Sequence, residues 1–272
     1  MALVISQEMV IQWYPGHMAQ AMRQLVDKMK LIDVVIEVVD ARLPAISSND
    51  MLDAVIGKKP RMLVLGHDDL ADPIRTVKWL AHYNGHHRRV VAVNAKDAGS
   101  ISKANFHLGQ LTNGKGTQRA IVLGIPNTGK SSIINGLLRR TAAKAEDKAG
   151  VTRSMQWFRV QPTLELMDTP GILVPKIATP EAQWMLALTG ALPRDRFDAE
   201  DVVNRFHAWL TTITDGRTKV PSLETFAQTR GFMRKGSEVD LHNAAGSYIK
   251  DFNEGKFGRI TFEEPPGAQG AS

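Results

Sequence analysis

The stretch at residues 124–132 reads GIPNTGKSS, which fits the phosphate-binding pattern G-x-x-x-x-G-K-[ST]. Glycines let the backbone N–H groups of such a loop curl around phosphates, while Lys130 reaches the β- and γ-phosphates and the Ser131 hydroxyl binds Mg²⁺. The alternative is a glycine-rich turn without a ligand. A strand-like run, AIVLG, leads into the loop and a helix-like stretch leaves it, which favours nucleotide binding. The candidate nucleotide-binding residues here are Asn127, Thr128, Gly129, Lys130, Ser131 and Ser132.

A second motif, DTPGI, follows a short apolar run at residues 164–167. An acid at a strand end, here Asp168, holds Mg²⁺ through water, and the Gly171 N–H is placed to meet the γ-phosphate. An ordinary turn is the alternative, because Asp, Pro and Gly are all turn residues. Thr152 lies in a polar loop between the two motifs and is our candidate to complete the Mg²⁺ shell, against a simple loop threonine. The predicted Mg²⁺ ligands are Ser131, Thr152 and Asp168.

The elements around these motifs alternate between strand-like and helix-like segments. Short apolar runs rich in β-branched residues lie at 31–42, 61–66 and 88–95. Helix-like stretches lie at about 17–30, 47–57 and 73–84. This alternation predicts an α/β fold with a mostly parallel sheet and helices on both faces.

The order of the strands is unusual for a domain with this phosphate-binding loop. Such a domain needs about five or six strands, but only two good candidates follow the loop, near 155–160 and 163–167. Beyond residue 180 the pattern is helical. The missing strands must therefore be the three upstream ones, so the domain is circularly permuted. We expect a permuted P-loop domain over residues 1–178, a small all-helical domain over 179–264 and a disordered tail over 265–272.

Composition narrows the class of protein. Apolar residues make up 43% of the chain, which is enough for a packed core, and there is no cysteine, which excludes disulfides and Cys-ligated metal sites. A net charge of +6 favours an acidic partner such as nucleic acid. No apolar stretch is long enough to span a membrane, and the N-terminus lacks the features of a secretion signal.

In this order the motifs resemble the YlqF/RbgA family of circularly permuted GTPases, which assist assembly of the large ribosomal subunit. The resemblance runs from WYPGHM at 13–18 through DARLP at 40–44, GIPNTGKSS and DTPGI to GKFGRITFE at 255–263. It implies binding of GTP or GDP with Mg²⁺, slow intrinsic hydrolysis, and stimulation by the immature ribosomal particle.

The resemblance also assigns roles near the γ-phosphate. Ile172 stands where other GTPases place a glutamine that orients water, and in this family the histidine of PGHM is thought to supply that function. This implies a catalytic role for His17, although the residues alone favour simple packing near the N-terminus. Asn127 resembles the asparagine that helps bind K⁺ in potassium-activated GTPases, with a plain loop contact as the alternative.

The guanine-binding loop of such proteins reads N-K-x-D at a strand end. The corresponding residues here are Gly66, His67, Asp68 and Asp69, so the Asn and the Lys are absent. Asp69 retains the carboxylate that accepts hydrogen bonds from guanine N1–H and N2–H₂, and each such recognition is worth roughly 1–3 kcal/mol. We expect Asp69 to keep guanine selection, His67 to stack on the base, and the affinity to be lower than in a complete site.

The next loop, VNAKDAG at 93–99, resembles the S-A-K segment of the family, with Asn94 in place of Ser. The backbone N–H of Ala95 would meet guanine O6, and Lys96 would lie near the base.

The expected role of the C-terminal domain and the expected binding partner follow from the charge of the chain and from the family resemblance. We expect the helical domain to contact ribosomal RNA through phosphate groups, although such cations more often form only a solvated surface. The expected partner is a precursor of the large ribosomal subunit, both RNA and protein, and the expected state off the ribosome is a monomer. The bacterial cytoplasm or an organelle matrix is the expected location. The candidate RNA-binding cations are Arg234, Lys235, Lys250, Lys256 and Arg259.

Two functions remain open. One is a GTPase that docks on the immature large subunit and is released by GTP hydrolysis. The other is an RNA-binding scaffold with little turnover, which the altered guanine loop supports and the complete set of phosphate-site residues opposes. An ATP-using enzyme conflicts with Asp69 and with the order of the motifs.

Overall fold

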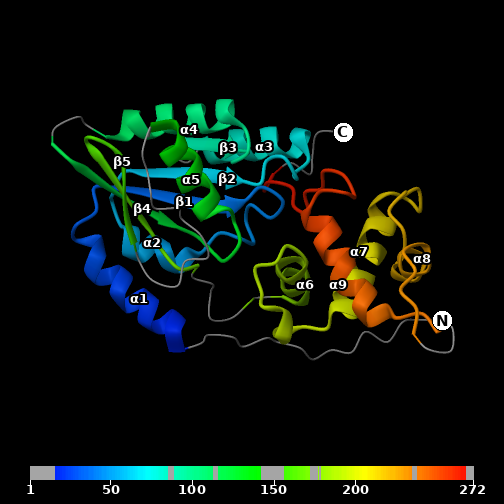
Figure 1. Cartoon of the computed structure of the whole chain (residues 1–272). Helices are drawn as coiled ribbons and strands as arrows, with labels where there is room; N and C mark the ends of the chain where they lie inside the picture. The colour runs from blue at the N-terminus through cyan, green and yellow to red at the C-terminus, as the bar shows by residue number, and fades with distance from the viewer. Residues whose placement is uncertain are drawn as a thin grey trace. The chain divides into compact units, whose positions relative to one another are not determined.

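The computed structural model describes residues 16–84, 89–112, 116–141, 156–171, 177, 179–234 and 238–267 (Figure 1). By internal contacts the chain forms two units. The sheet unit holds the described residues from 17 to 171 together with those from 251 to 267, and the helical unit holds those from 177 to 250.

The described strands form one sheet in the order β3-β2-β1-β4-β6-β5. All neighbours pair in parallel except β5 with β6, which are antiparallel. If the strands are renumbered so that β4, which precedes the phosphate loop, is strand 1, the order is 6-5-4-1-3-2. The strands that come earlier in the chain than β4 lie on one side of it in the sheet, and those that come later lie on the other side. The predicted permuted, mostly parallel sheet is therefore confirmed. The strands are β1 (Val34–Asp40), β2 (Arg61–Gly66), β3 (Arg89–Val93), β4 (Gln118–Leu123), β5 (Gln156–Gln161) and β6 (Leu164–Asp168).

Helices pack on both faces of this sheet, because alternate side chains of each strand point to opposite sides. On one face Val35 packs with residues of α1 (Gly16–Met29) and α2 (Asp50–Ile56), and Val39 packs with Trp79 of α3 (Pro73–Asn84). On the other face Ile36 and Val38 pack with α4 (Ala98–Leu111) and α5 (Lys130–Thr141).

Sequence analysis did not predict α4. Its segment is rich in Gly, Ser and Asn, which are poor helix formers. Its buried residues Ile101, Ala104 and Leu108 nevertheless recur at helical spacing, and the Asp97 carboxylate caps its first turn by accepting from the Ser100 N–H at 2.6 Å. These two signals together would have identified the helix.

The helical unit contains the helices predicted after residue 180. An aromatic cluster forms part of its core, with Tyr248 in edge contact with both Phe206 and Phe226. The Tyr248 hydroxyl donates to the Pro221 carbonyl at 2.8 Å, so its polar atom is satisfied. No helix of the described residues is both long enough and apolar enough to span a membrane. The helices are α6 (Pro180–Leu188), α7 (Ala199–Ile213), α8 (Leu223–Thr229) and α9 (Leu241–Asn253).

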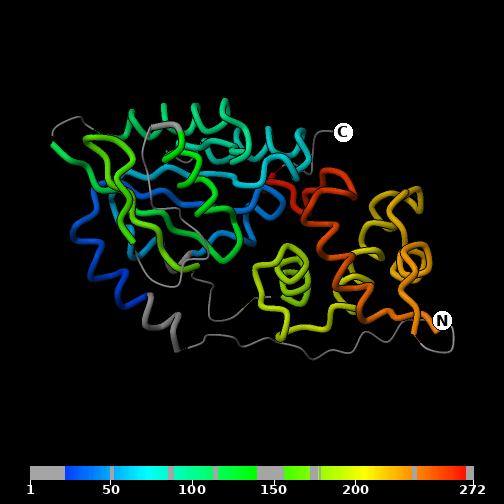
Figure 2. The backbone as a smooth tube through the Cα atoms, viewed as in Figure 1, coloured from blue at the N-terminus to red at the C-terminus, as the bar shows by residue number. Residues whose placement is uncertain are grey.

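The segment after α9, residues 255–264, lies along the loops at the carboxyl ends of β1 and β2, and we call it the C-terminal strap. Figure 2 follows it, in red, back to the sheet. The Phe262 N–H donates to the Arg42 carbonyl at 2.9 Å, and the Glu263 carboxylate accepts from the N–H groups of Ala45 and Ile46. Sequence analysis assigns these residues to the helical domain, whereas their contacts group them with the sheet unit.

We expect the stability of this attachment to depend on pH through Glu263. Burial raises the pKa of its carboxyl from the usual 4.5 to about 7. The negative charge of Asp40 also raises this pKa, whereas the two N–H donors lower it. The folded protein therefore holds a proton there that the unfolded chain releases, so stability falls as pH rises from about 4.5 to 7. Between pH 5 and pH 8 the free energy of urea unfolding should therefore fall by about 1–3 kcal/mol less in Glu263→Gln than in the wild-type protein. Equal pH profiles in both proteins would contradict the prediction.

Candidate functional site

The phosphate-binding loop joins β4 to α5 and is closed by its own side chains. The Lys130 Nζ donates to the Ile125 carbonyl at 2.7 Å, and the Thr128 hydroxyl donates to the same oxygen at 3.1 Å. Gly124 has a φ of +149° and lies so close to β1 that a Cβ would be 2.2 Å from the Val38 carbonyl oxygen. The loop therefore requires glycine at this position, as the motif predicts.

Lys130 is buried, with 6% of its surface exposed. Burial lowers the pKa of its ammonium group to about 8, although the nearby Asp168 carboxylate acts in the opposite direction. A buried cation at the start of a helix is stabilised by a nearby anion, so this position favours anion binding. Phosphate groups would supply the negative charge.

The two phosphate-site motifs meet at the carboxyl ends of β4 and β6. The Ser131 hydroxyl donates to Asp168 Oδ2 at 2.9 Å. A Cβ on Gly171 would lie 2.5 Å from the Pro126 nitrogen, so the DTPG segment abuts the phosphate loop. A hydroxyl beside a carboxylate is an oxygen donor set of the kind that Mg²⁺ prefers, so these residues fit a magnesium ion.

The altered base loop contacts the phosphate loop directly. A Cβ on Gly66 would lie 2.4 Å from the Thr128 carbonyl oxygen, which leaves no room for a side chain. His67 has a φ of +57°, and its Nε2 lies 3.0 Å from the Asn127 carbonyl oxygen, close enough for a hydrogen bond. The histidine thus connects the base loop to the phosphate loop at the position of the missing Lys.

The structure brings Asp69 and the VNAKDAG segment together. Lys96 Nζ donates to Asp69 Oδ2 at 2.9 Å, with Lys96 itself 79% exposed. Asn94 Oδ1 accepts from the Lys96 N–H, and the Asn94 N–H donates to the Ser100 hydroxyl, each at 2.9 Å. Ala95 is partly buried against the core. The ends of β2 and β3 therefore place the carboxylate beside the loop that we predicted to meet the base.

Other predicted residues cannot be placed. Thr152 and Ile172 lie outside the described residues. His17 lies in the first turn of α1, and its side chain is outside the described part of the structure.

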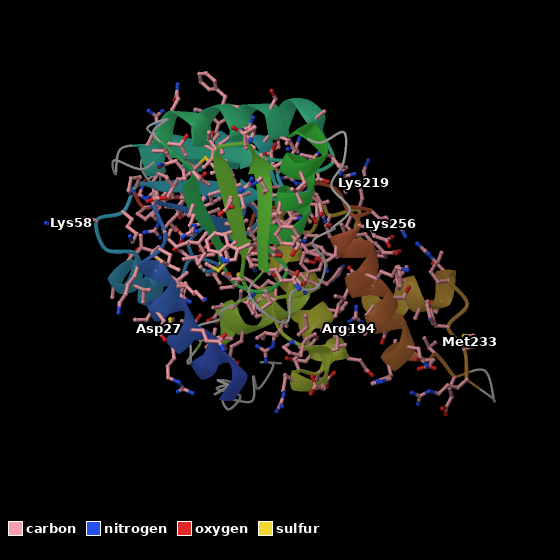
Figure 3. All side chains as sticks on the ribbon, turned by 60° about the vertical axis from the view of Figure 1, so that its left-hand side comes forward. Asp27, Lys58, Arg194, Lys219, Met233 and Lys256 are labelled. Carbon is pink, nitrogen blue, oxygen red and sulfur yellow. The ribbon has the colours of Figure 1, made fainter. Side chains whose placement is uncertain are left out.

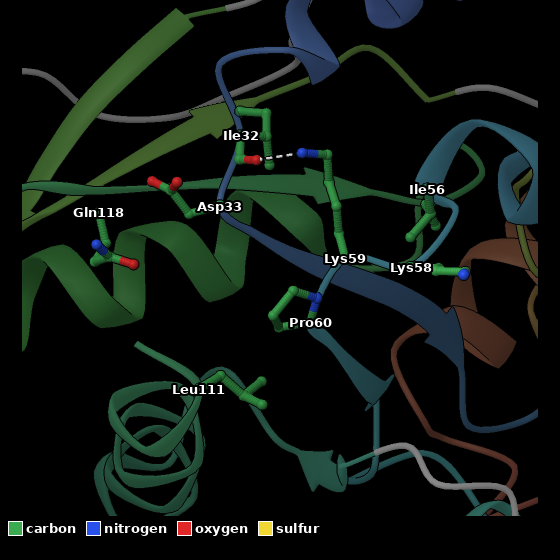
Figure 4. Close-up of a pocket in the computed structure, with 8 residues that line it drawn as sticks. All are labelled: Ile32, Asp33, Ile56, Lys58, Lys59, Pro60, Leu111 and Gln118. Carbon is green, nitrogen blue, oxygen red and sulfur yellow. Dashed lines mark hydrogen bonds between the residues drawn. The ribbon is translucent and has the colours of Figure 1, made fainter. Parts of the chain in front are cut away.

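A cavity of about 560 Å³ lies near the amino ends of β1, β2 and β4, at the end of the strands opposite the phosphate loop (Figure 4). Lys59 crosses it and donates from Nζ to the Ile32 carbonyl at 2.7 Å. It is distant in the fold from the phosphate motifs, which lie at the carboxyl ends of the strands, so it is not the nucleotide site.

Sequence analysis did not identify the charged pair at the end of β1. The Arg42 guanidinium makes two hydrogen bonds to the buried Asp40 carboxylate, at 2.9 and 2.7 Å. Burial alone would raise the pKa of Asp40, but the Arg42 charge holds it below its usual value. Arg42 also donates to Asn253 Oδ1 at 2.9 Å, which connects the DARLP loop to the end of α9.

Restoring the missing asparagine of N-K-x-D should harm the protein. Gly66→Asn forces a Cβ against the Thr128 carbonyl, and such overpacking costs about 1–3 kcal/mol and displaces the phosphate loop. We expect a lower melting temperature and weaker GDP binding. Gly109→Asn is the matched control, because among the described residues no atom outside its own helix backbone lies within 4 Å of a Cβ there. Tighter GDP binding by Gly66→Asn would refute this account of the loop.

Comparisons with known proteins show the family of this chain. Residues 119–208 match the family model described as 50S ribosome-binding GTPase. The chain is 36% identical to Ribosome biogenesis GTPase A of Bacillus cereus, over 94% of this chain and 95% of that protein. It is 33% identical to Short integuments 2, mitochondrial, of Arabidopsis thaliana, over 74% of this chain and 56% of that protein.

A solved structure shares the fold. The crystal structure of GNP-bound YlqF from T. maritima superposes with a TM-score of 0.71, at 29% identity, over 91% of this chain and 99% of that one. The permuted strand order, the two phosphate-site motifs at neighbouring strand ends and the near full-length relatives agree. The chain therefore belongs to the ribosome biogenesis GTPase A family of YlqF/RbgA proteins, which are GTP hydrolases.

Proposed function

We propose that this protein is a GTPase that binds the immature large ribosomal subunit, assists its late assembly, and is released when GTP is hydrolysed. The observation that carries the proposal is the meeting of Lys130, Ser131 and Asp168 at adjacent strand ends. An RNA scaffold without turnover has no need for a buried lysine beside a hydroxyl–carboxylate pair. The names of the relatives support ribosome assembly as the process.

At the phosphates, the backbone N–H groups from Asn127 to Ser132 would surround the nucleotide. Lys130 would exchange the Ile125 carbonyl for β- and γ-phosphate oxygens. Ser131, Asp168 and Thr152 would hold Mg²⁺, which offsets negative charge on the phosphates when bound. Gly171 would donate its N–H to the γ-phosphate. Ser132 and Thr128 complete the loop.

At the base, we propose that Asp69 selects guanine. Its carboxylate accepts two hydrogen bonds from guanine, and adenine offers no matching pair of donors at that edge. Ala95 would donate its N–H to O6, and Lys96, which pairs with one Asp69 carboxylate oxygen at 2.9 Å, would lie beside the base. His67 would lie against the base while holding Asn127.

Two roles depend on the family resemblance. His17 would orient the attacking water, because Ile172 cannot. Asn127 would contribute to a K⁺ site; its φ of +59° is a conformation that asparagine tolerates better than most residues.

The proposed RNA face belongs to the helical unit. Among the predicted cations, Arg234 pairs with Asp240, Lys256 with Asp251 and Glu254, and Arg259 with backbone carbonyls, whereas Lys235 lies outside the described residues. The face that we propose is formed by exposed cations of this unit, Lys250 among them. Figure 3 marks two of them, Arg194 and Lys219. We propose a monomer off the ribosome, in a bacterial cytoplasm or an organelle matrix, because one named relative is from a bacterium and another is named mitochondrial.

The test is GTP and ATP hydrolysis with and without precursor particles of the large subunit, in K⁺ and in Na⁺. We expect turnover of GTP alone, stimulated by the particles and by K⁺. No turnover under any condition, with binding to the particles retained, would favour the scaffold instead. Stimulated turnover unchanged in His17→Ala would refute the role of His17.

A further inference from the structure

The C-terminal strap holds the base loop from outside. Arg259 donates from Nε to the Ala71 carbonyl and from Nη2 to the Asp68 carbonyl, each at 2.7 Å. Between these two contacts, the Ile260 N–H donates to the Leu70 carbonyl at 2.9 Å. The strap therefore binds the backbone of residues 68, 70 and 71, which lie on both sides of Asp69.

Close packing reinforces these hydrogen bonds. Gly255, with a φ of +79°, comes so near the loop that a Cβ would lie 2.8 Å from Leu70 Cδ2. The Thr261 hydroxyl accepts from the Asp72 N–H at 3.0 Å, and Arg75 of α3 pairs with Glu264 at 2.8 Å. The strap is thus anchored on both sides of the place where Arg259 acts.

The base loop lacks the side-chain support that the asparagine of N-K-x-D would give. Gly66 has no side chain, and His67 contacts the phosphate loop. Within the loop the backbone closes one turn, in which the Leu70 N–H donates to the His67 carbonyl at 2.9 Å. The position of the Asp69 carboxylate depends on the backbone from 68 to 71, since a hydrogen-bonding pair with guanine tolerates little displacement.

We propose that Arg259 is a positioning residue for guanine recognition: by binding the carbonyls of Asp68 and Ala71 it holds Asp69 in place, a task that the missing Asn would otherwise share. The proposal rests on the proposed role of Asp69. It makes the strap part of the nucleotide site, so the RNA face excludes Arg259.

The test compares the affinities of the full-length protein for GDP, IDP and inorganic pyrophosphate. IDP lacks the 2-amino group, so the GDP to IDP ratio reports how well Asp69 is aligned, while pyrophosphate reports on the phosphate loop alone. In Arg259→Ala we expect GDP affinity to fall about tenfold, the GDP to IDP ratio to fall with it, and pyrophosphate affinity to stay the same. Arg259→Lys, which can reach only one carbonyl, should be intermediate.

The controls separate the possible failures. Arg217→Ala removes an arginine that is 80% exposed and contacts the neighbouring Asp215 carboxylate and Thr214 carbonyl, and it should change none of the three affinities. If Asp69→Asn lowers the GDP to IDP ratio but Arg259→Ala does not, the proposal for Arg259 is wrong and that for Asp69 stands. Equal losses for GDP and pyrophosphate would mean that Arg259 only supports the fold. If Asp69→Asn leaves the ratio unchanged, both proposals fail.

Discussion

Asp69→Asn should change the preferred base from guanine to xanthine. Guanine presents two donors to the carboxylate, whereas the asparagine amide offers one acceptor and one donor. Xanthine matches that pair, because it keeps N1–H and carries a carbonyl oxygen in place of the 2-amino group. We expect GDP affinity to fall at least about hundredfold, and XDP to bind better than GDP, as measured by calorimetry with both nucleotides.

Asp68→Asn is the matched control for this change. Asp68 lies one position away, and its carboxylate faces Arg259 at 3.9 Å and not Lys96. If Asp68→Asn and not Asp69→Asn produced the switch, the alignment of this loop with N-K-x-D would be wrong by one residue. If neither did, the base would be bound elsewhere.

Lys130→Met should greatly slow turnover while leaving the protein folded. The ammonium group is a buried cation on the phosphate loop, and loss of one such group typically costs about 10²–10³ in rate. Two effects on stability oppose each other: the variant no longer buries a charge, but Asp168 loses a neighbouring cation. We therefore expect GTP hydrolysis to fall at least about hundredfold with little change in melting temperature.

Lys58→Met is the control for the loss of a lysine. Lys58 is exposed, at the edge of the sheet away from the phosphate motifs (Figure 3), and its replacement should leave hydrolysis unchanged. Hydrolysis above a tenth of the wild-type rate in Lys130→Met would show that the loop is not the phosphate site.

The phosphate loop could be recognised as a motif because the contacts within it are local. Lys130 and Thr128 both donate to Ile125, so the loop is closed within six residues and appears as one continuous motif. The strands could also be predicted, since buried parallel strands are short runs of apolar residues rich in β-branched side chains. α4 was missed because packing of Ile101, Ala104 and Leu108 outweighs the weak helix propensity of its segment.

The sequence by itself determined the fold class and the phosphate-loop motif, because each depends on patterns within a few neighbouring positions, and it determined the permuted order through the succession of those patterns along the chain. Only the tertiary structure decided how the base half is built. Gly66 carries no side chain because Thr128, from a distant loop, occupies the space. The loop that bears Asp69 is held by Arg259, which is 191 positions from Asp68. Contacts between residues so far apart in the chain cannot be recognised from the spacing of residue types, because the partners become neighbours only when the chain folds.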